Sequence, residues 1–180
     1  FIPKTGVVKG INIGVKERLY NNYLAIGYGN YASPYAELFI HKNTRFNNDF
    51  GIHTKYSASN ENIKKTILNS TFSNFNMATF FKQQERYFDW KVNLDASQNN
   101  YNWYGLSSDK TFTENTIKSI NEAQKYTHLK LKGAFSFHNS YIDFSKISVS
   151  HFTDKFNSSE TLLNFETKLD FPLDRLSANL

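Results

Sequence analysis

The sequence predicts an all-β protein, an antiparallel transmembrane β-barrel with about eight strands in this chain. The alternation of side chains between residues 86 and 99 is the clearest observation. A period of two is that of a pleated strand, because successive side chains leave opposite faces. The run is longer than the five or six residues usual in soluble domains and fits the 9–11 residues that cross a bilayer. Its apolar side chains are Phe88, Trp90, Val92, Leu94 and Ala96, and its polar ones are Asp89, Lys91, Asn93, Asp95 and Ser97.

The remaining elements follow from the same reading along the chain. Residues 1–17 have no sustained period and are expected to form an extended lead-in, and the barrel strands occupy residues 18–180. In the seventh strand the phase slips between Phe144 and Ile147, which a β-bulge would accommodate. We expect the strands at residues 19–29, 34–42, 50–59, 71–82, 86–99, 126–138, 141–153 and 160–171.

The lengths of the connections are a second, independent signal. Every link after an even-numbered strand is short, and the two long links, residues 60–70 and 100–125, both follow odd-numbered strands. Transmembrane barrels place tight turns at one end and long loops at the other. Within the longer link, residues 113–125 are predicted to form a short helix, since Ile117 and Ile120 have i,i+3 spacing.

The composition allows a barrel without demanding it. Aromatic residues are 17% of a chain that is only 39% hydrophobic, and the mean hydropathy is −0.56. This balance is typical of barrels with aromatic girdles and also of soluble aromatic-rich sandwiches. No apolar run is long enough for a transmembrane helix, so any span must be made of strands. The charge of +5 is spread along the chain, which argues against a nucleic-acid partner.

No pattern of catalytic or metal-binding residues emerges. The chain has no cysteine, which excludes thiolate ligands and nucleophiles. No enzyme activity, metal or cofactor is therefore expected. A serine hydrolase formed across the barrel wall by Ser57, Ser59 or Ser150 is a third alternative. The five histidines lack the helical i,i+4 spacing of metal sites; they are His41, His53, His128, His138 and His151.

Two surfaces are predicted from the alternation. Charged residues of neighbouring strands are expected to share the polar face and form cross-strand ion pairs, with a substrate path as the alternative. Tyr101, Trp103 and Tyr104 are expected either to join an interfacial girdle or to stack a ligand at the loop mouth. The residues predicted to face lipid are Phe88, Trp90, Val92, Leu94, Leu129, Leu131, Phe135, Leu163, Phe165 and Leu169.

Several short motifs resemble a known family. A strand that ends in GYGNY leads to PYAELF, then to GIHTKYSAS and later to YNWYGL. This series resembles a Bacteroidetes outer-membrane β-barrel family described as TonB-dependent-receptor-like. The matching positions are Gly27, Gly29, Asn30, Tyr31, Pro34, Ala36, Glu37, Leu38, Phe39, Gly51, His53, Lys55, Ser57 and residues 101–106.

The resemblance implies a bacterial outer-membrane location and a porin-like, transport or receptor role. Outer-membrane lipid and other outer-membrane proteins would be the partners. It also implies a larger barrel, of which this chain would be the N-terminal part. Two departures from the family are that no plug domain and no TonB box can be recognised.

The alternative is a soluble all-β carbohydrate-binding module. In that case Tyr101, Trp103 and Tyr104 would stack glycans, and Phe88, Trp90 and Val92 would face a second sheet. In a barrel these three residues would face lipid instead. The surroundings of residues 88–92 therefore distinguish the two classes.

Overall fold

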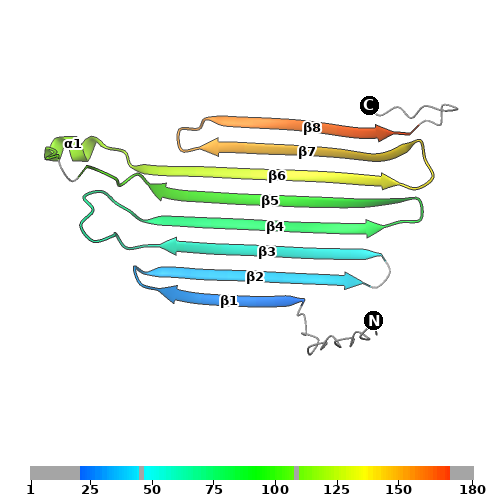
Figure 1. The fold of residues 1–180 in the computed structure, drawn as a ribbon, viewed down its shortest axis with the longest axis horizontal. Helices are drawn as coiled ribbons and strands as arrows, with labels where there is room; N and C mark the ends of the chain where they lie inside the picture. The colour runs from blue at the N-terminus through cyan, green and yellow to red at the C-terminus, as the bar shows by residue number, and fades with distance from the viewer. Residues whose placement is uncertain (1–20, 45–46, 108–109, 171–180) are drawn as a thin grey trace, which may run out of the picture.

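The computed structural model of the protein describes residues 21–44, 47–107 and 110–170. It confirms the prediction of an all-β protein, since eight antiparallel strands form a single sheet in the order β1 to β8 (Figure 1). β1 and β8 are the two edges, so these residues form an open sheet. The elements are β1 (Asn22–Gly29), β2 (Ser33–Thr44), β3 (Asn48–Ser59), β4 (Phe72–Gln84), β5 (Phe88–Asn102), α1 (Glu114–Ser119), β6 (Ala123–Phe137), β7 (Ile142–Asp154) and β8 (Ser159–Leu169).

Each expected strand corresponds to one observed strand, with shifts at the ends. The largest shift concerns the predicted helix over 113–125, which is shorter than expected. Thr113 caps α1 by accepting a hydrogen bond from the Thr116 N–H, as N-cap threonines do, but Ile120 already has extended backbone angles. Residues 123–125 instead pair with β5, where Ala123 lies opposite Asn102. The cross-strand ladder thus outweighs the helical spacing. The lead-in predicted at residues 1–17 lies outside the described residues.

The predicted bulge in the seventh strand is confirmed, although it lies earlier than the sequence pattern indicates. The ladder between β7 and β8 shifts register between Ile142 and Phe144. Phe144 is therefore moved to the polar side of the sheet, where the Lys146 ammonium lies 4.2 Å from the centre of its ring. The bulge changes the face of one aromatic residue and restores the phase of the rest of the strand.

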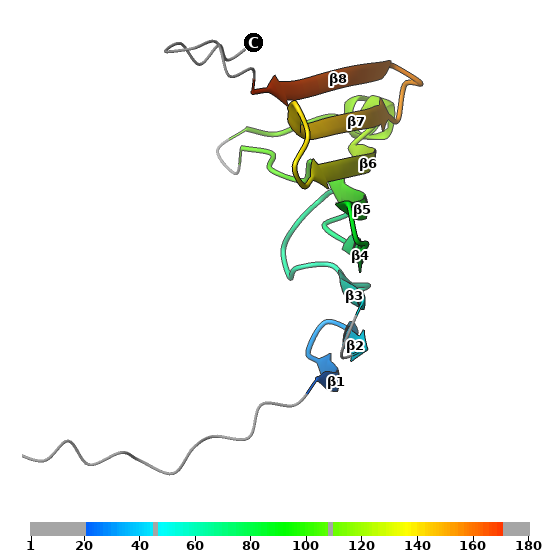
Figure 2. The same cartoon turned by 90° about the vertical axis from the view of Figure 1, so that its right-hand side faces the viewer.

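The sheet is a single layer. Viewed along its strands, it forms one bent wall with no second sheet against either face of the described residues (Figure 2). Ala58 and Leu68 are the buried hydrophobic residues of this part of the chain. The strands are therefore held together by backbone pairing and neighbouring side chains, and not by a central core. None of the helices described is long and apolar enough to cross a membrane.

The meander sorts the connections by length, as the sequence predicts. All strands are antiparallel to their neighbours, so the links after odd-numbered strands share one end of the sheet, called here the loop end (Figure 1). Both long links, residues 60–71 and 103–122, lie there. The links after β2, β4 and β6 lie at the opposite end, called here the turn end.

Candidate functional site

One face of the sheet is apolar across all eight strands. Residues directly opposite each other in an antiparallel pair share a face, so the register assigns each side chain to a side. Leu94 of β5 lies between Thr79 of β4 and Leu131 of β6. The row continues through Val149 of β7 to Leu163 of β8. All ten side chains predicted to face lipid lie on this side, called here the apolar face.

The apolar face is graded from its centre to its ends. Aliphatic side chains such as Leu38, Ile52 and Leu131 occupy the middle of the strands. Among the register-paired residues this face has no carboxylate, and its lysines, Lys42 and Lys125, lie near strand ends. Aromatic side chains lie at both ends. Those at the turn end are Phe50, Phe81, Phe88, Trp90, Phe135 and Phe137, and those at the loop end are Tyr28, Tyr56 and Phe75.

The sequence predicts aromatic girdles and places Phe88, Trp90 and Phe135 on the lipid-facing side, but it does not indicate which residues form these two belts. Their members come from different strands, and only the register aligns them. Phe81 and Trp90, for example, lie on neighbouring strands with ring centres 5.2 Å apart. Tyr56 and Phe75 lie directly opposite each other on β3 and β4. Aromatic girdles of this kind flank the apolar band of membrane barrels.

The opposite side, called here the polar face, has a hydrogen-bonded cluster on its first three strands. Glu37 of β2 accepts hydrogen bonds from the Tyr23 hydroxyl (2.6 Å) and from the Tyr35 hydroxyl, and its Oε1 lies 2.7 Å from His53 Nε2. The Lys55 ammonium lies over the Tyr35 ring. One carboxylate thus joins side chains of β1, β2 and β3, and charged acceptors make the stronger hydrogen bonds of proteins.

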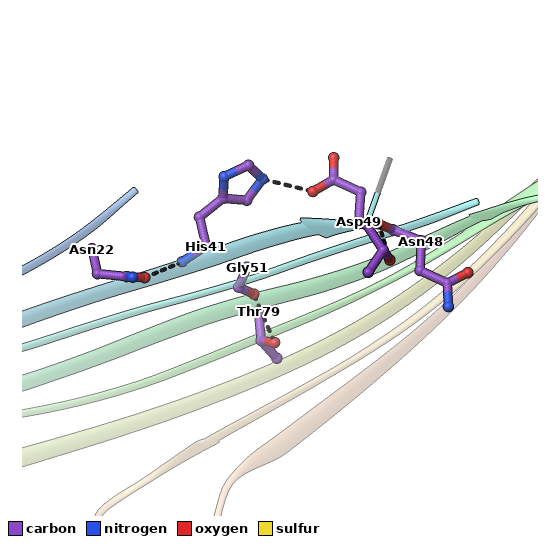
Figure 3. A network of polar contacts seen from close by, with 7 residues as sticks. Asn22, His41, Asn48, Asp49, Gly51 and Thr79 are labelled. Atoms are coloured by element: carbon purple, nitrogen blue, oxygen red, sulfur yellow. Dashed lines mark hydrogen bonds and ion pairs between the residues drawn. The ribbon is translucent and has the colours of Figure 1, made fainter. Parts of the chain in front are cut away.

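Next to this cluster, the missing side chain of Gly51 on β3 leaves space for the ring of Phe80 on β4. A Cβ atom on Gly51 would come within 2.3 Å of the Phe80 ring on β4. On the other neighbouring strand, β2, His41 lies opposite Gly51 and on the same face of the sheet as Phe80. Its Nε2 lies 2.6 Å from Asp49 Oδ1. Figure 3 shows His41 and Asp49 on one side of the sheet and the Thr79 side chain, which donates to the Gly51 carbonyl (3.0 Å), on the other.

The predicted cross-strand ion pairs are present on strands β5 to β8. Lys132 pairs with Asp95 at 3.3 Å, Lys146 with Glu166 at 3.7 Å, and Lys168 with Asp143 at 2.7 Å. All these side chains are partly exposed, where an ion pair contributes about 0–1 kcal/mol. The pairs neutralise much of the charge on the polar face and leave it hydrated.

Four of the histidines each contact one polar side chain of a residue that the structure describes. Three of them contact a carboxylate, His41 with Asp49, His53 with Glu37, and His138 with Asp89. His151 contacts the Thr161 hydroxyl. No group of three or more potential ligands is close enough for a metal ion among the described residues. Of the three serines in the hydrolase alternative, Ser59 donates its hydroxyl to the backbone carbonyls of Tyr31 and Glu61.

A cavity of about 560 Å³ lies at the loop end of the polar face. Its floor is formed by strand residues of β4, β5 and β6, and residues of the two long connections contribute its walls. Tyr101 and Tyr104, predicted as girdle or ligand-stacking residues, both line it, whereas Trp103 is 62% exposed and does not. Tyr101 lies on the polar face, away from the belts. The complete lining is Ser59, Ile63, Ser70, Thr71, Phe72, Asn74, Asn99, Tyr101, Asn102, Tyr104 and Tyr126.

We expect Glu37→Gln to lower the stability of the sheet. An amide offers a single acceptor oxygen, so at least one of the three donors that now reach the Glu37 carboxylate would lose its partner. The urea midpoint of unfolding should fall. The matched control is Glu166→Gln, which removes only an exposed pair with Lys146 and should change the midpoint less. Equal midpoints for the two variants would contradict a stabilising role of the Glu37 cluster.

Comparison with known proteins adds no further assignment. No protein-family model matches the chain, and no curated protein or solved structure matches it either. The two faces of the sheet and the cavity at its loop end are therefore the features that bear on function.

Proposed function

We propose that this chain is the wall of an integral outer-membrane β-barrel, of transport or receptor type or a barrel subunit of a larger outer-membrane assembly. The observation that carries the proposal is the apolar face, which is aliphatic at its centre and has aromatic belts at the turn end on β3 to β6 and at the loop end on β1, β3 and β4. A soluble domain buries such a face against a second layer. A membrane barrel leaves it against lipid.

Strand length supports the same function. Most strands have between 11 and 15 residues, enough for the 9–11 that cross the bilayer and for short extensions beyond it. The aromatic belts would then lie at the two interfaces, where amphipathic rings are enriched. On this proposal the ten predicted residues, with Leu94 near their centre, contact lipid.

The polar face would line the barrel interior. Its ion pairs and the Glu37 cluster are suited to a hydrated lumen, where charged groups remain solvated. The unpaired edges of β1 and β8 would be closed by further strands, because an open sheet edge does not occur within hydrocarbon. This arrangement agrees with the larger barrel implied by the family resemblance.

The soluble carbohydrate-binding module is the competing function. It requires a second sheet against Phe88, Trp90 and Val92. The described strands form one sheet, and Phe135, which lies opposite Trp90, is 40% exposed. A covering layer would have to come from other residues. The barrel proposal needs no such layer, because lipid covers the face.

The proposal places the loop end outside the cell and the turn end in the periplasm, as loop lengths do in known barrels. Trypsin added to intact cells should therefore cut after Lys64 or Lys118 and spare Arg86 in the β4–β5 turn. All three residues are exposed, so the sheet itself gives no reason for the difference.

Mass spectrometry of the fragments from the native protein measures this selectivity. Permeabilising the outer membrane is the control, and it should make Arg86 accessible as well. If trypsin cut the protein on intact cells after Arg86 and not after Lys64 or Lys118, the topology would be the reverse of the proposed one. Recovery of the folded protein in the soluble fraction, without detergent, would contradict the membrane proposal itself.

A further inference from the structure

The cavity at the loop end has the size and setting of a ligand site. Its volume of about 560 Å³ falls within the range of about 300–1,000 Å³ found for small-molecule sites. Strand residues such as Asn74 and Tyr126 contribute the floor, and Ile63 and Tyr104 come from the two long connections. Figure 2 shows the β3–β4 connection and the segment that follows β5 on the same side of the sheet. The cavity is therefore bounded by ordered strands and by two separate loops.

Aromatic rings form a row along the floor. Phe72 of β4 lies opposite Tyr101 of β5. The ring of Tyr101 is 5.8 Å from that of Tyr126 on β6, and Tyr126 is 5.7 Å from Phe152 on β7. The planes of these neighbouring rings differ by 31° and 21°, and Phe72, Tyr101 and Tyr126 of this row line the cavity. A lining rich in aromatic rings suits a ligand that presents C–H groups to it.

Two side-chain amides beside this row make no hydrogen bond to another described residue. Asn74 and Asn99 lie opposite each other on β4 and β5 and both line the cavity. Neither side chain makes a hydrogen bond within the described part of the chain, and both are half-buried. Each amide offers two N–H donors and an acceptor oxygen. A ligand with neighbouring hydroxyl groups would satisfy both kinds of atom at once.

The lining has no charged side chain. Hydroxyl, amide and aromatic groups make up its surface. Lys125 and Lys155 line an adjoining cavity that shares Tyr101 and Asn102 with this one, and the Lys155 ammonium is already bonded to Asn121 and to the Ala123 carbonyl. An anionic ligand bound on this lining alone would leave its hydration shell without gaining an opposite charge, which is costly. The chemistry of the lining thus selects a neutral ligand.

The wall formed by the β3–β4 connection is held in place before any ligand binds. The Ser70 hydroxyl accepts from the Ile63 N–H at 2.8 Å, and the Ser70 N–H donates to Asn62 Oδ1 at 2.9 Å. The Asn102 amide donates to the Thr71 carbonyl at 2.8 Å, which ties this connection to β5. A preformed wall lowers the ordering cost of binding.

We propose that this cavity binds a neutral saccharide, whose ring stacks on Tyr101 and Tyr126 and whose hydroxyl groups bond Asn74 and Asn99. The inference goes beyond the barrel function and does not depend on what covers the apolar face. In the proposed barrel the site would lie on the lumen side of the wall, at the extracellular loop end, where an oligosaccharide would first meet the protein.

Titration calorimetry on the folded protein in detergent tests the proposal, with maltohexaose, cellohexaose and xylohexaose as neutral probes and hexagalacturonate as the acidic one. At least one neutral probe should bind, and more tightly than the acidic probe. Asn99→Ala should weaken this binding by roughly tenfold, the effect of losing about one hydrogen bond to the ligand. Tyr101→Ala should weaken it at least as much.

Asn93→Ala is the matched control, because it removes the same amide from the same strand and face but outside the cavity. Its affinity should equal that of the wild type. Circular dichroism and heat modification in gels verify that each variant is folded. The proposal is overturned if no neutral probe binds, if the acidic probe binds more tightly, or if Asn99→Ala and Asn93→Ala bind equally well.

Discussion

Replacing Leu94 by arginine should strongly reduce folding of the protein into a lipid bilayer, whereas Asn93→Arg should fold almost as the wild type does. Leu94 lies near the middle of β5 and between Thr79 and Leu131 on the apolar face. An arginine at the bilayer midplane costs about 2–4 kcal/mol in a membrane barrel. Asn93 lies on the polar face, two residues from Asp95, whose carboxylate pairs with Lys132 and can also interact with a neighbouring arginine.

The folded fraction of each variant in liposomes, measured by heat modification in gels and by tryptophan fluorescence, checks this result. Asn93 lies opposite Lys132, so its arginine variant has a small repulsive cost of its own, about 0.2–1 kcal/mol. The expected difference remains larger than that cost. If the two variants fold equally well, the alternation does not report a bilayer, and the soluble carbohydrate-binding module becomes the better interpretation.

The strands could be predicted from the sequence because their alternation is local. In β5, side chains from Phe88 to Ala96 change face at every residue, and the register keeps that order in the structure. The bulge in β7 shows the limit of this reasoning. A phase slip is visible in the sequence, but whether Phe144 belongs to the residues before or after it depends on the pairing with β8.

The belts and the cavity depend on contacts between strands, which one strand's sequence does not contain. Trp90 meets Phe81 only because β4 and β5 pair in this register. The same is true of Asn74 and Asn99 in the cavity. For Tyr101 a signal was available. Extending the alternation of β5 by two residues past Asn99 places it with Asp89 and Lys91 on the polar face, and so away from an interfacial girdle.

The contacts between histidines and carboxylates could not be predicted for the same reason. His53 and Glu37 are sixteen positions apart in the chain, yet they lie on neighbouring strands and bond at 2.7 Å. His41 and Asp49 meet across the β2–β3 pair in the same way. Sequence spacing tests only for ligands on one element, so it cannot reveal a polar cluster built across a sheet.

The second large effect is expected at Gly51. An alanine there would place its Cβ 2.3 Å from Phe80 Cε1 and 2.8 Å from Cζ, so the ring would have to leave its position. Overpacking of a well-packed core costs about 1–3 kcal/mol, and on this half-buried face we expect a cost at the lower end of that range. Gly51→Ala should therefore lower the urea midpoint of unfolding clearly. Phe80 also lies 6.2 Å from His41 and under the Lys91 ammonium, so these contacts would be lost with it.

A double-mutant cycle separates the clash from any general effect of alanine in the strand. With Phe80→Ala in place, Gly51→Ala should cost little, giving a coupling energy of about 0.5–3 kcal/mol. Gly27→Ala is the matched control, since the nearest atom to its Cβ would be Tyr35 Cβ at 3.7 Å, an ordinary contact. Alanine in place of a strand glycine even gains about 0.5–1 kcal/mol where space allows. If Gly51→Ala still lowers the free energy of unfolding when the Phe80 ring is absent, the glycine is required by the backbone of β3 and not by the space that the ring occupies.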